Sequence, residues 1–241
     1  MEFRILGPLA ATDGVRELTP PRPKSRALLA LLLLRAGQVV SPDEALNALW
    51  GERPPPAARN ALQGHVAALR KLLGSDRIET RGGGYALQLE EDELDLHRFE
   101  QLLTDAQDRD PLEKAEALAH ALALFRGAPL EDFRYDSFAS GEAARIEELR
   151  LFALEEWMDA QLALGRHARL VSRLDQLVSE EPLRERLRGQ QMLALYRSGR
   201  QAEALEAYRR ARHTFRDELG VDPGPALERL HREILNQDPE L

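Results

Sequence analysis

Two adjacent stretches, AARNALQGHVAALRKLL at residues 57–73 and IETRGGGYALQL at residues 78–89, decide the fold. Apolar residues recur in the first stretch at a 3.6-residue spacing, which predicts an amphipathic helix that ends at Gly74. This apolar stripe comprises Leu62, Val66, Leu69 and Leu73, widened by Ala58, Ala61, His65 and Leu72. The second stretch has two short strand-like runs around Gly82-Gly83-Gly84, which is typical of a β-hairpin. We therefore expect a helix with one polar face, followed by a glycine hairpin.

Residues 1–18 predict a small meander of about three short strands. Residues 2–6 alternate polar and apolar side chains, which indicates a half-buried strand. The turn pairs Gly7-Pro8 and Asp13-Gly14 divide the segment into its strands. The sheet then ends at Pro20, Pro21 and Pro23.

Two helices are expected between this meander and the helix of residues 57–73. The first runs from about Lys24 to Ala36 and ends at Gly37, and its apolar residues surround the axis, so it should be buried. The second begins at the capping box Ser41-Pro42-Asp43-Glu44, which has proline at the first helical position, and ends near Trp50. Strands, three helices and a basic hairpin in this order predict a winged helix-turn-helix.

The outward face of the third helix carries the residue types that read DNA. Its polar residues are Arg59, Asn60, Gln63, Arg70 and Lys71, with the small residues Gly64 and Ala67 among them. Arginine binds guanine in a bidentate manner, asparagine and glutamine bind adenine in the same way, and arginine or lysine hold phosphates. Taken alone, the face is more typical of a solvated helix surface, and only the predicted winged helix-turn-helix around it favours DNA.

The charge distribution separates a basic segment from an acidic remainder. The chain of 241 residues carries a net charge of −8, yet residues 16–85 hold eleven bases and six acids. Residues 86–241 hold 21 bases and 33 acids. A basic first third joined to an acidic remainder predicts two different tasks.

The sequence lacks the motifs of catalysis, metal binding and membrane insertion. It has no cysteine, its six histidines lack metal-ligand spacing, and no nucleophile-elbow motif is present. Gly82-Gly83-Gly84 leads into a strand pattern, so a hairpin turn is favoured over a phosphate loop. The longest apolar run, Ala27 to Leu34, has eight residues, whereas a bilayer span needs about 20. We predict a cytoplasmic, nucleoid-associated protein that is not an enzyme and has no metal, cofactor, membrane segment or small-molecule substrate.

Residues 96–241 predict an all-α domain. Its amphipathic helices follow the acidic run Glu90 to Asp95, which marks the predicted boundary between domains of residues 1–95 and 96–241. The pairs Gly165-Arg166 and Gly199-Arg200 lie 34 residues apart, which is the period of tetratricopeptide repeats. The predicted fold class is mostly α with a small β component, a winged helix-turn-helix followed by tetratricopeptide-like helices.

The two halves together resemble one known family. Residues 1–95 resemble the OmpR-type winged-helix DNA-binding domain, through LLALL (28–32), VVS (39–41), ALWG (48–51), VAALRKL (66–72) and TRGGGY (80–85). Residues 96–241 resemble the bacterial transcriptional activation domain, through DLHRF (95–99), LFRGAPL (124–130), LYRSGR (195–200) and ELGVDPG (218–224). In this order they are similar to the Streptomyces antibiotic regulatory protein family. Because the family lacks a phosphorylatable receiver domain, and this sequence likewise starts at the first strand, phosphorelay control is not expected.

The resemblance extends the assignment of DNA contacts residue by residue. Arg59, Asn60 and Gln63 match the exposed N-terminal part of the family's recognition helix, so we predict that they read base edges. Arg70 and Lys71 match a basic pair that holds phosphate in the family, although the helix dipole also favours basic residues there. Further phosphate or wing contacts are predicted for Arg22, Lys24, Arg26, Arg77, Thr80 and Arg81; for the first three, plain solubility is the alternative. Packing roles are expected for Trp50, His65 and Tyr85.

The resemblance also implies partners. The loop of residues 51–56, with Gly51, Glu52, Arg53 and Pro54, faces RNA polymerase in the resembled folds, and a plain helix connector is the alternative. The implied activator binds direct repeats in double-stranded promoter DNA as a homodimer and recruits RNA polymerase holoenzyme to a secondary-metabolite (antibiotic) gene cluster. A helical-repeat scaffold anchored to DNA and a repressor of the same fold are the alternatives.

Overall fold

The computed structural model describes residues 1–239 and 241, which form two compact units. The first unit comprises residues 1–105 and 120–151, and the second comprises residues 106–119 and 152–241. The predicted fold class is confirmed, since 61% of residues are helical and 7% lie in strands. The predicted domain boundary after residue 95 remains a prediction; by their contacts, residues 96–105 and 120–151 pack with the first 95 residues.

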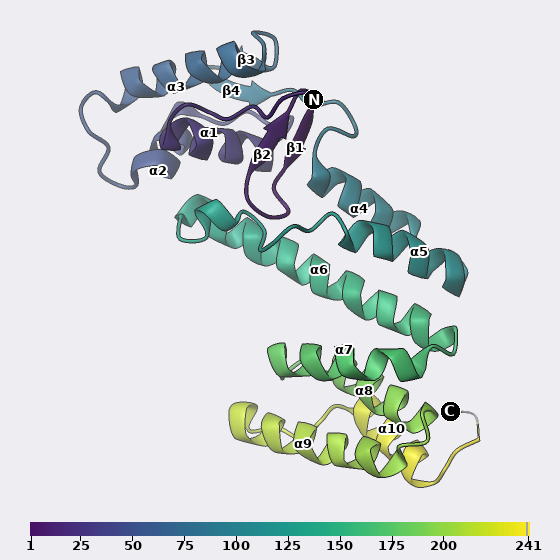
Figure 1. Cartoon of the computed structure of the whole chain (residues 1–241). Helices are drawn as coiled ribbons and strands as arrows, with labels where there is room; N and C mark the ends of the chain where they lie inside the picture. The colour runs from purple at the N-terminus through teal and green to yellow at the C-terminus, as the bar shows by residue number, and fades with distance from the viewer. Residues whose placement is uncertain (240) are drawn as a thin grey trace. The chain divides into compact units, whose positions relative to one another are not determined.

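The first unit holds the four strands found in the described residues (Figure 1). Its elements up to residue 105 are β1 (Glu2–Arg4), β2 (Ala10–Thr12), α1 (Pro23–Leu34), α2 (Pro42–Trp50), α3 (Ala58–Leu73), β3 (Ile78–Arg81), β4 (Gly84–Leu87) and α4 (Asp95–Asp105). The chain continues through α5 (Pro111–Leu122), the short 3₁₀ helix η1 (Glu131–Phe133) and α6 (Ser137–Ala163).

The N-terminal meander has two strands instead of the three expected. β1 pairs antiparallel with β2, with Phe3 opposite Ala11, and the expected third strand is reduced to a single bridge between Thr12 and Glu17. The Asp13 carboxylate accepts the N–H groups of residues 15 and 16, which closes a tight turn after β2. The prolines that follow have no N–H to extend a ladder, so the third strand stops after one bridge.

The three helices of the predicted winged helix-turn-helix are confirmed. α1 ends at Leu34, two residues before the predicted end. α2 begins after Ser41, whose hydroxyl accepts the Glu44 N–H at 3.1 Å, as the capping box predicts. α3 buries the predicted apolar stripe with two exceptions. Leu72 is half-buried, and Ala61 is exposed because it lies about 100° around the helix from the buried Leu62.

The hairpin is anchored to the segment that precedes α2. Arg81 pairs with Gly84 across a two-residue turn, in which both glycines have positive φ, as the favoured hairpin turn requires. Val40 and Tyr85 exchange backbone hydrogen bonds of 2.8 and 2.9 Å, so β4 is held on both sides. A Cβ at Gly84 would overlap the Val40 carbonyl oxygen, which explains the glycine by close approach of two backbones.

Replacing Gly84 with alanine is therefore expected to push β4 away from residue 40 and to lower the free energy of unfolding by about 1–3 kcal/mol. Urea unfolding of the variant beside the wild-type chain measures this. The matched control is Gly141→Ala, at an exposed position of α6 where a Cβ meets nothing within 4 Å. This control should be neutral or stabilising by up to about 1 kcal/mol. An equal effect of both substitutions would show that Val40 does not constrain residue 84.

The acidic run that marks the predicted boundary packs against the N-terminal segment. Glu93 accepts hydrogen bonds from the Met1 amino group at 2.7 Å and from Arg77 at 2.8 Å. Burial alone would raise the pKa of Glu93, but these bonds and the Glu90 N–H lower it to about 2. The buried Asp95 carboxylate accepts the N–H groups of residues 5 and 6 at 2.8–3.0 Å. These two side chains fasten the start of the chain to α4.

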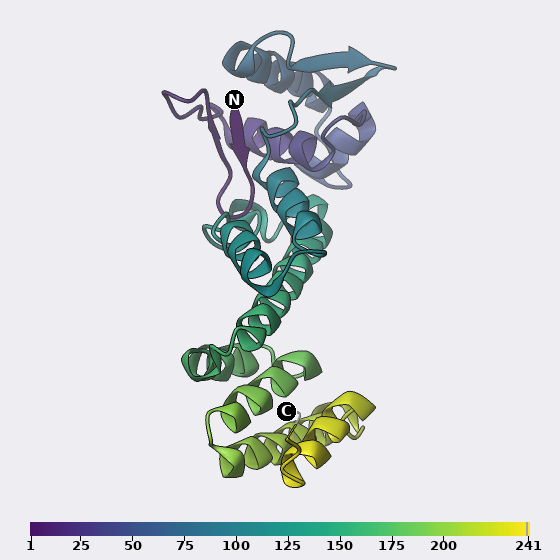
Figure 2. The same ribbon diagram turned by 90° about the vertical axis from the view of Figure 1, so that its right-hand side faces the viewer.

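The second unit is built from successive helices that pack one against the next (Figure 2). They are α7 (His167–Glu180), α8 (Glu185–Arg197), α9 (Gln201–Leu219) and α10 (Pro225–Leu235). Gly165 and Gly199 adopt φ of 70° and 76° where α6 and α8 end, so the repeated glycines are equivalent helix stops. No helix in residues 1–239 combines the length and hydrophobicity needed to cross a membrane.

Candidate nucleic-acid interface

One face of α3 is exposed and polar, and it belongs to the outer surface of the first unit. The residues Arg59, Asn60, Gln63, Ala67 and Lys71 are exposed. On the opposite face Leu62, Val66, Leu69 and Leu73 are at most 2% exposed and pack toward α1 and α2. The hairpin β3–β4 lies beside the C-terminal part of α3, where β3 contacts α3 and β4 contacts α1 (Figure 1). The candidate surface therefore combines an accessible helix face with an adjacent wing.

Buried polar contacts fix α3 on α1. The His65 ring nitrogen Nδ1 lies 2.9 Å from the Ser25 hydroxyl, and its ring lies 6.0 Å from that of Trp50. Burial, with the charges of Arg22 and Lys24, lowers the pKa of His65, so the ring is neutral at pH 7. The predicted packing role of His65 is thereby confirmed, and its contacts join the apolar stripe in holding α3 with Asn60 and Gln63 outward.

Arg70 and Thr80, both predicted to touch DNA, contact each other. The Arg70 Nε donates to the Ile78 carbonyl and its Nη2 donates to the Thr80 hydroxyl, both at 2.8 Å. The guanidinium therefore joins the C-terminal part of α3 to β3. The Lys71 side chain is exposed and forms no hydrogen bond or ion pair with another residue in the part of the chain that the structure describes. The basic pair consequently divides into one positioning residue and one free cation.

Arg70→Ala and Lys71→Ala remove the same charge one residue apart and should have different effects. Loss of the Arg70 hydrogen bonds should raise the amide exchange rate of β3 and β4 by roughly tenfold. Lys71→Ala should leave this exchange unchanged and reduce the salt dependence of DNA binding by about 0.9 in log–log slope. Hydrogen exchange and affinities at several salt concentrations measure the two effects. Unchanged wing exchange in Arg70→Ala would refute the role of Arg70 in holding the wing.

Two exposed ion pairs involve other predicted contact residues. Arg59 lies 2.7 Å from the Asp43 carboxylate, with both side chains more than two-thirds exposed, and Arg81 lies 2.9 Å from Glu79. Exposed pairs contribute little free energy, so either arginine can exchange its partner for a phosphate or a base. Asp43 is absent from the sequence-based site; its capping-box position predicts a helix start but not a contact with α3.

Three predicted phosphate contacts are instead used within the first unit. The Lys24 Nζ donates to the Leu49 carbonyl at the end of α2 and lies 4.9 Å from the Trp50 ring centroid. Arg26 bonds Asp132 at 2.8 Å, and Arg77 bonds Glu93. Each cation meets a carbonyl or carboxylate from a distant segment, which the local sequence does not reveal. We leave all three out of the proposed interface, whereas Arg22 is exposed.

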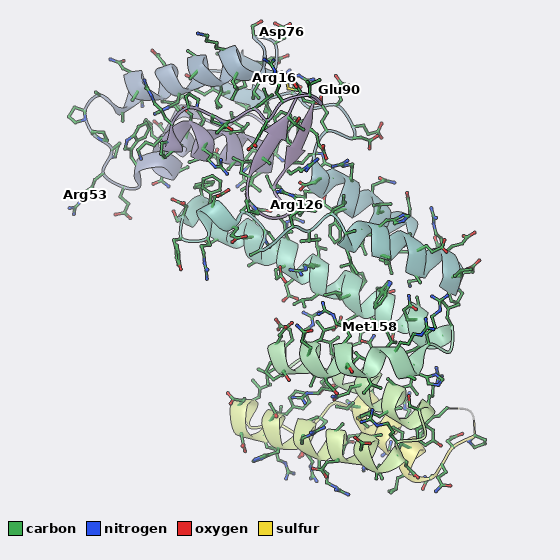
Figure 3. All side chains as sticks on the ribbon, in the orientation of Figure 1. Arg16, Arg53, Asp76, Glu90, Arg126 and Met158 are labelled. Carbon is green, nitrogen blue, oxygen red and sulfur yellow. The ribbon has the colours of Figure 1, made fainter. Side chains whose placement is uncertain are left out.

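The loop between α2 and α3 is accessible along its whole length. Residues 51–57 are exposed, Gly51 ends α2 with a φ of 70°, and the side chain of Arg53 points away from the helices (Figure 3). This geometry suits both predicted roles of the loop, a partner contact and a plain connector. Within residues 1–239 and 241, no three histidine, aspartate or glutamate side chains form a group that could hold a metal ion.

Comparison with known families matches both halves of the chain. Residues 17–87 match the model of the transcriptional regulatory protein C-terminal domain, and residues 94–235 match that of the bacterial transcriptional activator domain. In the solved structures, EmbR of Mycobacterium tuberculosis in complex with a low-affinity phosphopeptide is similar, with a TM-score of 0.93 and 35% identity. That similarity covers 99% of this chain and 65% of EmbR.

Curated relatives match along the whole chain. The regulatory protein AfsR of Streptomyces griseus is 40% identical over 245 residues, and this chain spans about a quarter of its length. The transcriptional regulator RedD of Streptomyces coelicolor is 40% identical, and the match covers all of this chain and 72% of RedD. The regulatory protein DnrI of Streptomyces peucetius is 38% identical, with 99% and 93% covered.

The fold, the exposed α3 face and these matches define the class of winged-helix transcriptional regulators. Within it, the chain belongs to the Streptomyces antibiotic regulatory protein family.

Proposed function

We propose that the protein is a sequence-specific transcriptional activator that lays α3 in the major groove of promoter DNA. The exposed row Arg59, Asn60 and Gln63 on α3 is the observation that carries this proposal. Their side chains match the hydrogen-bonding edges of guanine and adenine, and the small residues Gly64 and Ala67 leave room for the groove walls. Lys71, Arg81 and Arg22 then supply phosphate contacts, which give affinity without selecting sequence.

Membership of the family supports a proposed arrangement on DNA. Two protomers bind direct repeats about one helical turn apart, so that both α3 helices approach the same side of the duplex. The exposed loop 51–56 faces RNA polymerase, and its three consecutive prolines reduce the entropy lost on docking. A secondary-metabolite gene cluster at the nucleoid is the proposed target, as the family name indicates.

Selection from a randomised duplex library tests the DNA-binding step. The wild-type chain should enrich duplexes with two copies of one motif in the same orientation. A library that stays random after selection would refute sequence-specific binding and favour the scaffold, and inverted copies would refute the direct-repeat arrangement.

Transcription in vitro tests the outcome of binding. Templates with the enriched site upstream of a promoter should give more transcript when the protein is added to RNA polymerase holoenzyme. Less transcript would identify a repressor of the same fold. A template with the scrambled site is the control, and its transcription should not respond.

A further inference from the structure

A cavity of about 520 Å³ lies within the second unit, between α7, α8 and α9. Its volume falls in the range of small-molecule sites, which is roughly 300–1,000 Å³. Val178 and Leu195 give it apolar walls, and Arg188, Gln191 and Arg210 give it polar ones. All of these residues lie outside the candidate DNA interface, so the cavity is a separate site.

Arg188 is a buried cation without a carboxylate partner. The residue is only 7% exposed, and its Nε and Nη2 both donate to the Pro182 carbonyl, at 3.2 and 2.9 Å. In the described part of the chain its hydrogen bonds go to this carbonyl, and the charge that acts on it most is that of another arginine, Arg210. Burial and the nearby charge of Arg210 lower the pKa of Arg188, so its charge is opposed by its surroundings. A buried charge of this kind is costly unless an anion pairs with it.

Gln191 adds a second unsatisfied group to the same cavity. The residue is 3% exposed, and its Nε2 donates to Asp175 at 2.6 Å. Its Oε1 is buried and has no hydrogen-bond partner in the described part of the chain. Buried polar atoms are normally hydrogen-bonded, so a ligand with a hydrogen-bond donor would complete the bonding of this oxygen. The cavity wall thus holds a cation, a residue with a buried unpaired acceptor and apolar side chains together.

The charges that line the cavity select the type of anion. The three arginines Arg188, Arg200 and Arg210 face the two acids Asp175 and Glu203, which leaves one positive charge in excess. The Arg200 guanidinium is already paired with Glu203 through two hydrogen bonds of 2.6 and 2.7 Å. One uncompensated positive charge beside Asp175 favours a monoanion such as a carboxylate over a doubly charged phosphate.

We infer that this cavity binds the carboxylate of a ligand that also carries a hydrogen-bond donor and a small apolar group. The carboxylate pairs with Arg188 and Arg210, the donor bonds the Gln191 Oε1, and the apolar group packs on Val178 and Leu195. A free small acid and the C-terminal residue of a peptide share this chemistry. The site gives the helical unit of the regulator an input separate from the DNA-binding face.

N-acetyl-L-leucine carries all three features and is the probe for the full chain. Titration followed by the methyl NMR signals of residues 178 and 195 should show saturable binding with a Kd of about 1 mM. N-acetyl-L-leucinamide, which lacks the carboxylate, and inorganic phosphate at equal ionic strength should each bind at least about tenfold more weakly. The tripeptide acetyl-Ala-Ala-Leu distinguishes the sources: much tighter binding indicates a peptide terminus, and equal binding indicates a small acid.

Two adjacent exposed arginines of α9 provide a matched pair of variants. Arg210→Ala should weaken binding of the probe about fivefold, because it removes one charged donor at the cavity. Arg209→Ala removes the same charge from a side chain that pairs with Glu206 instead, and it should leave binding within twofold of wild type. Arg188→Gln should abolish binding, with thermal unfolding measured in parallel to establish that the unit is folded.

Three results would each overturn the inference. The first is the absence of saturable shifts up to about 20 mM probe, because such weak binding does not correspond to a built site. The second is equal affinity for the probe and for the amide or phosphate. The third is an equal effect of Arg210→Ala and Arg209→Ala on binding of the probe.

Discussion

The double substitution Asn60→Ala and Gln63→Ala is expected to remove at least about 30-fold of the preference for the selected operator over a scrambled duplex. Each bidentate side chain–base pair contributes about 1–3 kcal/mol of discrimination, and the two side chains lie on the same exposed face of α3. Neither residue carries charge, so affinity for the scrambled duplex and its salt dependence should stay close to wild type. Fluorescence anisotropy on both duplexes at one fixed salt concentration measures the ratio.

Arg59 should behave differently from its two neighbours because it is already paired. Its guanidinium lies 2.7 Å from Asp43, and this pair must open before Arg59 can reach a base. Arg59→Ala should therefore reduce both the preference for the operator and the salt dependence. Asp43→Ala frees Arg59 and removes a negative charge beside the groove, so it should strengthen binding to both duplexes.

Gln101→Ala is the control for the uncharged pair, since this glutamine is exposed on α4, away from α3. It should change neither affinity. If the Asn60 and Gln63 double variant still distinguishes the operator as the wild-type chain does, α3 does not read bases through this face. The proposed orientation of the helix in the groove would then be wrong, whatever the transcription experiment shows.

The elements that form the interface were predictable because their signals are local. Ser41 caps α2 through a hydroxyl three residues from the N–H it accepts, and Gly82 and Gly83 supply the positive φ that the hairpin turn needs. The apolar stripe of α3 repeats within a single helix. Each of these features is caused by residues within the same helix or turn, so a short stretch of sequence is enough to predict it.

The use of individual charges was not predictable, because it depends on residues far apart in the chain. Arg26 pairs with a carboxylate 106 residues away, and Arg77 pairs with Glu93, which lies in the run read as a boundary. On the sequence alone, these cations are indistinguishable from Lys71, which is exposed. Composition reports the excess of basic residues in the segment, and only the packing decides which of them face solvent.

The role of Asp95 also depends on residues far away in the chain, so the sequence does not reveal it. Its substitution should have the largest effect on stability. Asp95→Ala is expected to lower the free energy of unfolding of the first unit by about 2–5 kcal/mol, because it leaves two buried backbone N–H groups, those of Ile5 and Leu6, without acceptors. Chemical denaturation followed by Trp50 fluorescence, in a Trp157→Phe background, reports on this unit alone. Loss of β1 would also break the bridge between Phe3 in this strand and Leu94, the residue before α4.

Asp95→Asn separates hydrogen bonding from charge. Burial raises the pKa of Asp95, so its negative charge is opposed by the site and the stabilisation comes from its two acceptor oxygens. Asparagine keeps one of these oxygens and presents an NH₂ group to the other N–H, so it should lose about half of the effect of alanine. Asp92→Ala, an exposed acid of the same run, is the control and should change stability by less than about 0.5 kcal/mol. Equal losses for Asp92→Ala and Asp95→Ala would mean that the acidic run acts through its overall charge, and that the bonds from Asp95 to residues 5 and 6 do not hold the N-terminal strand to α4.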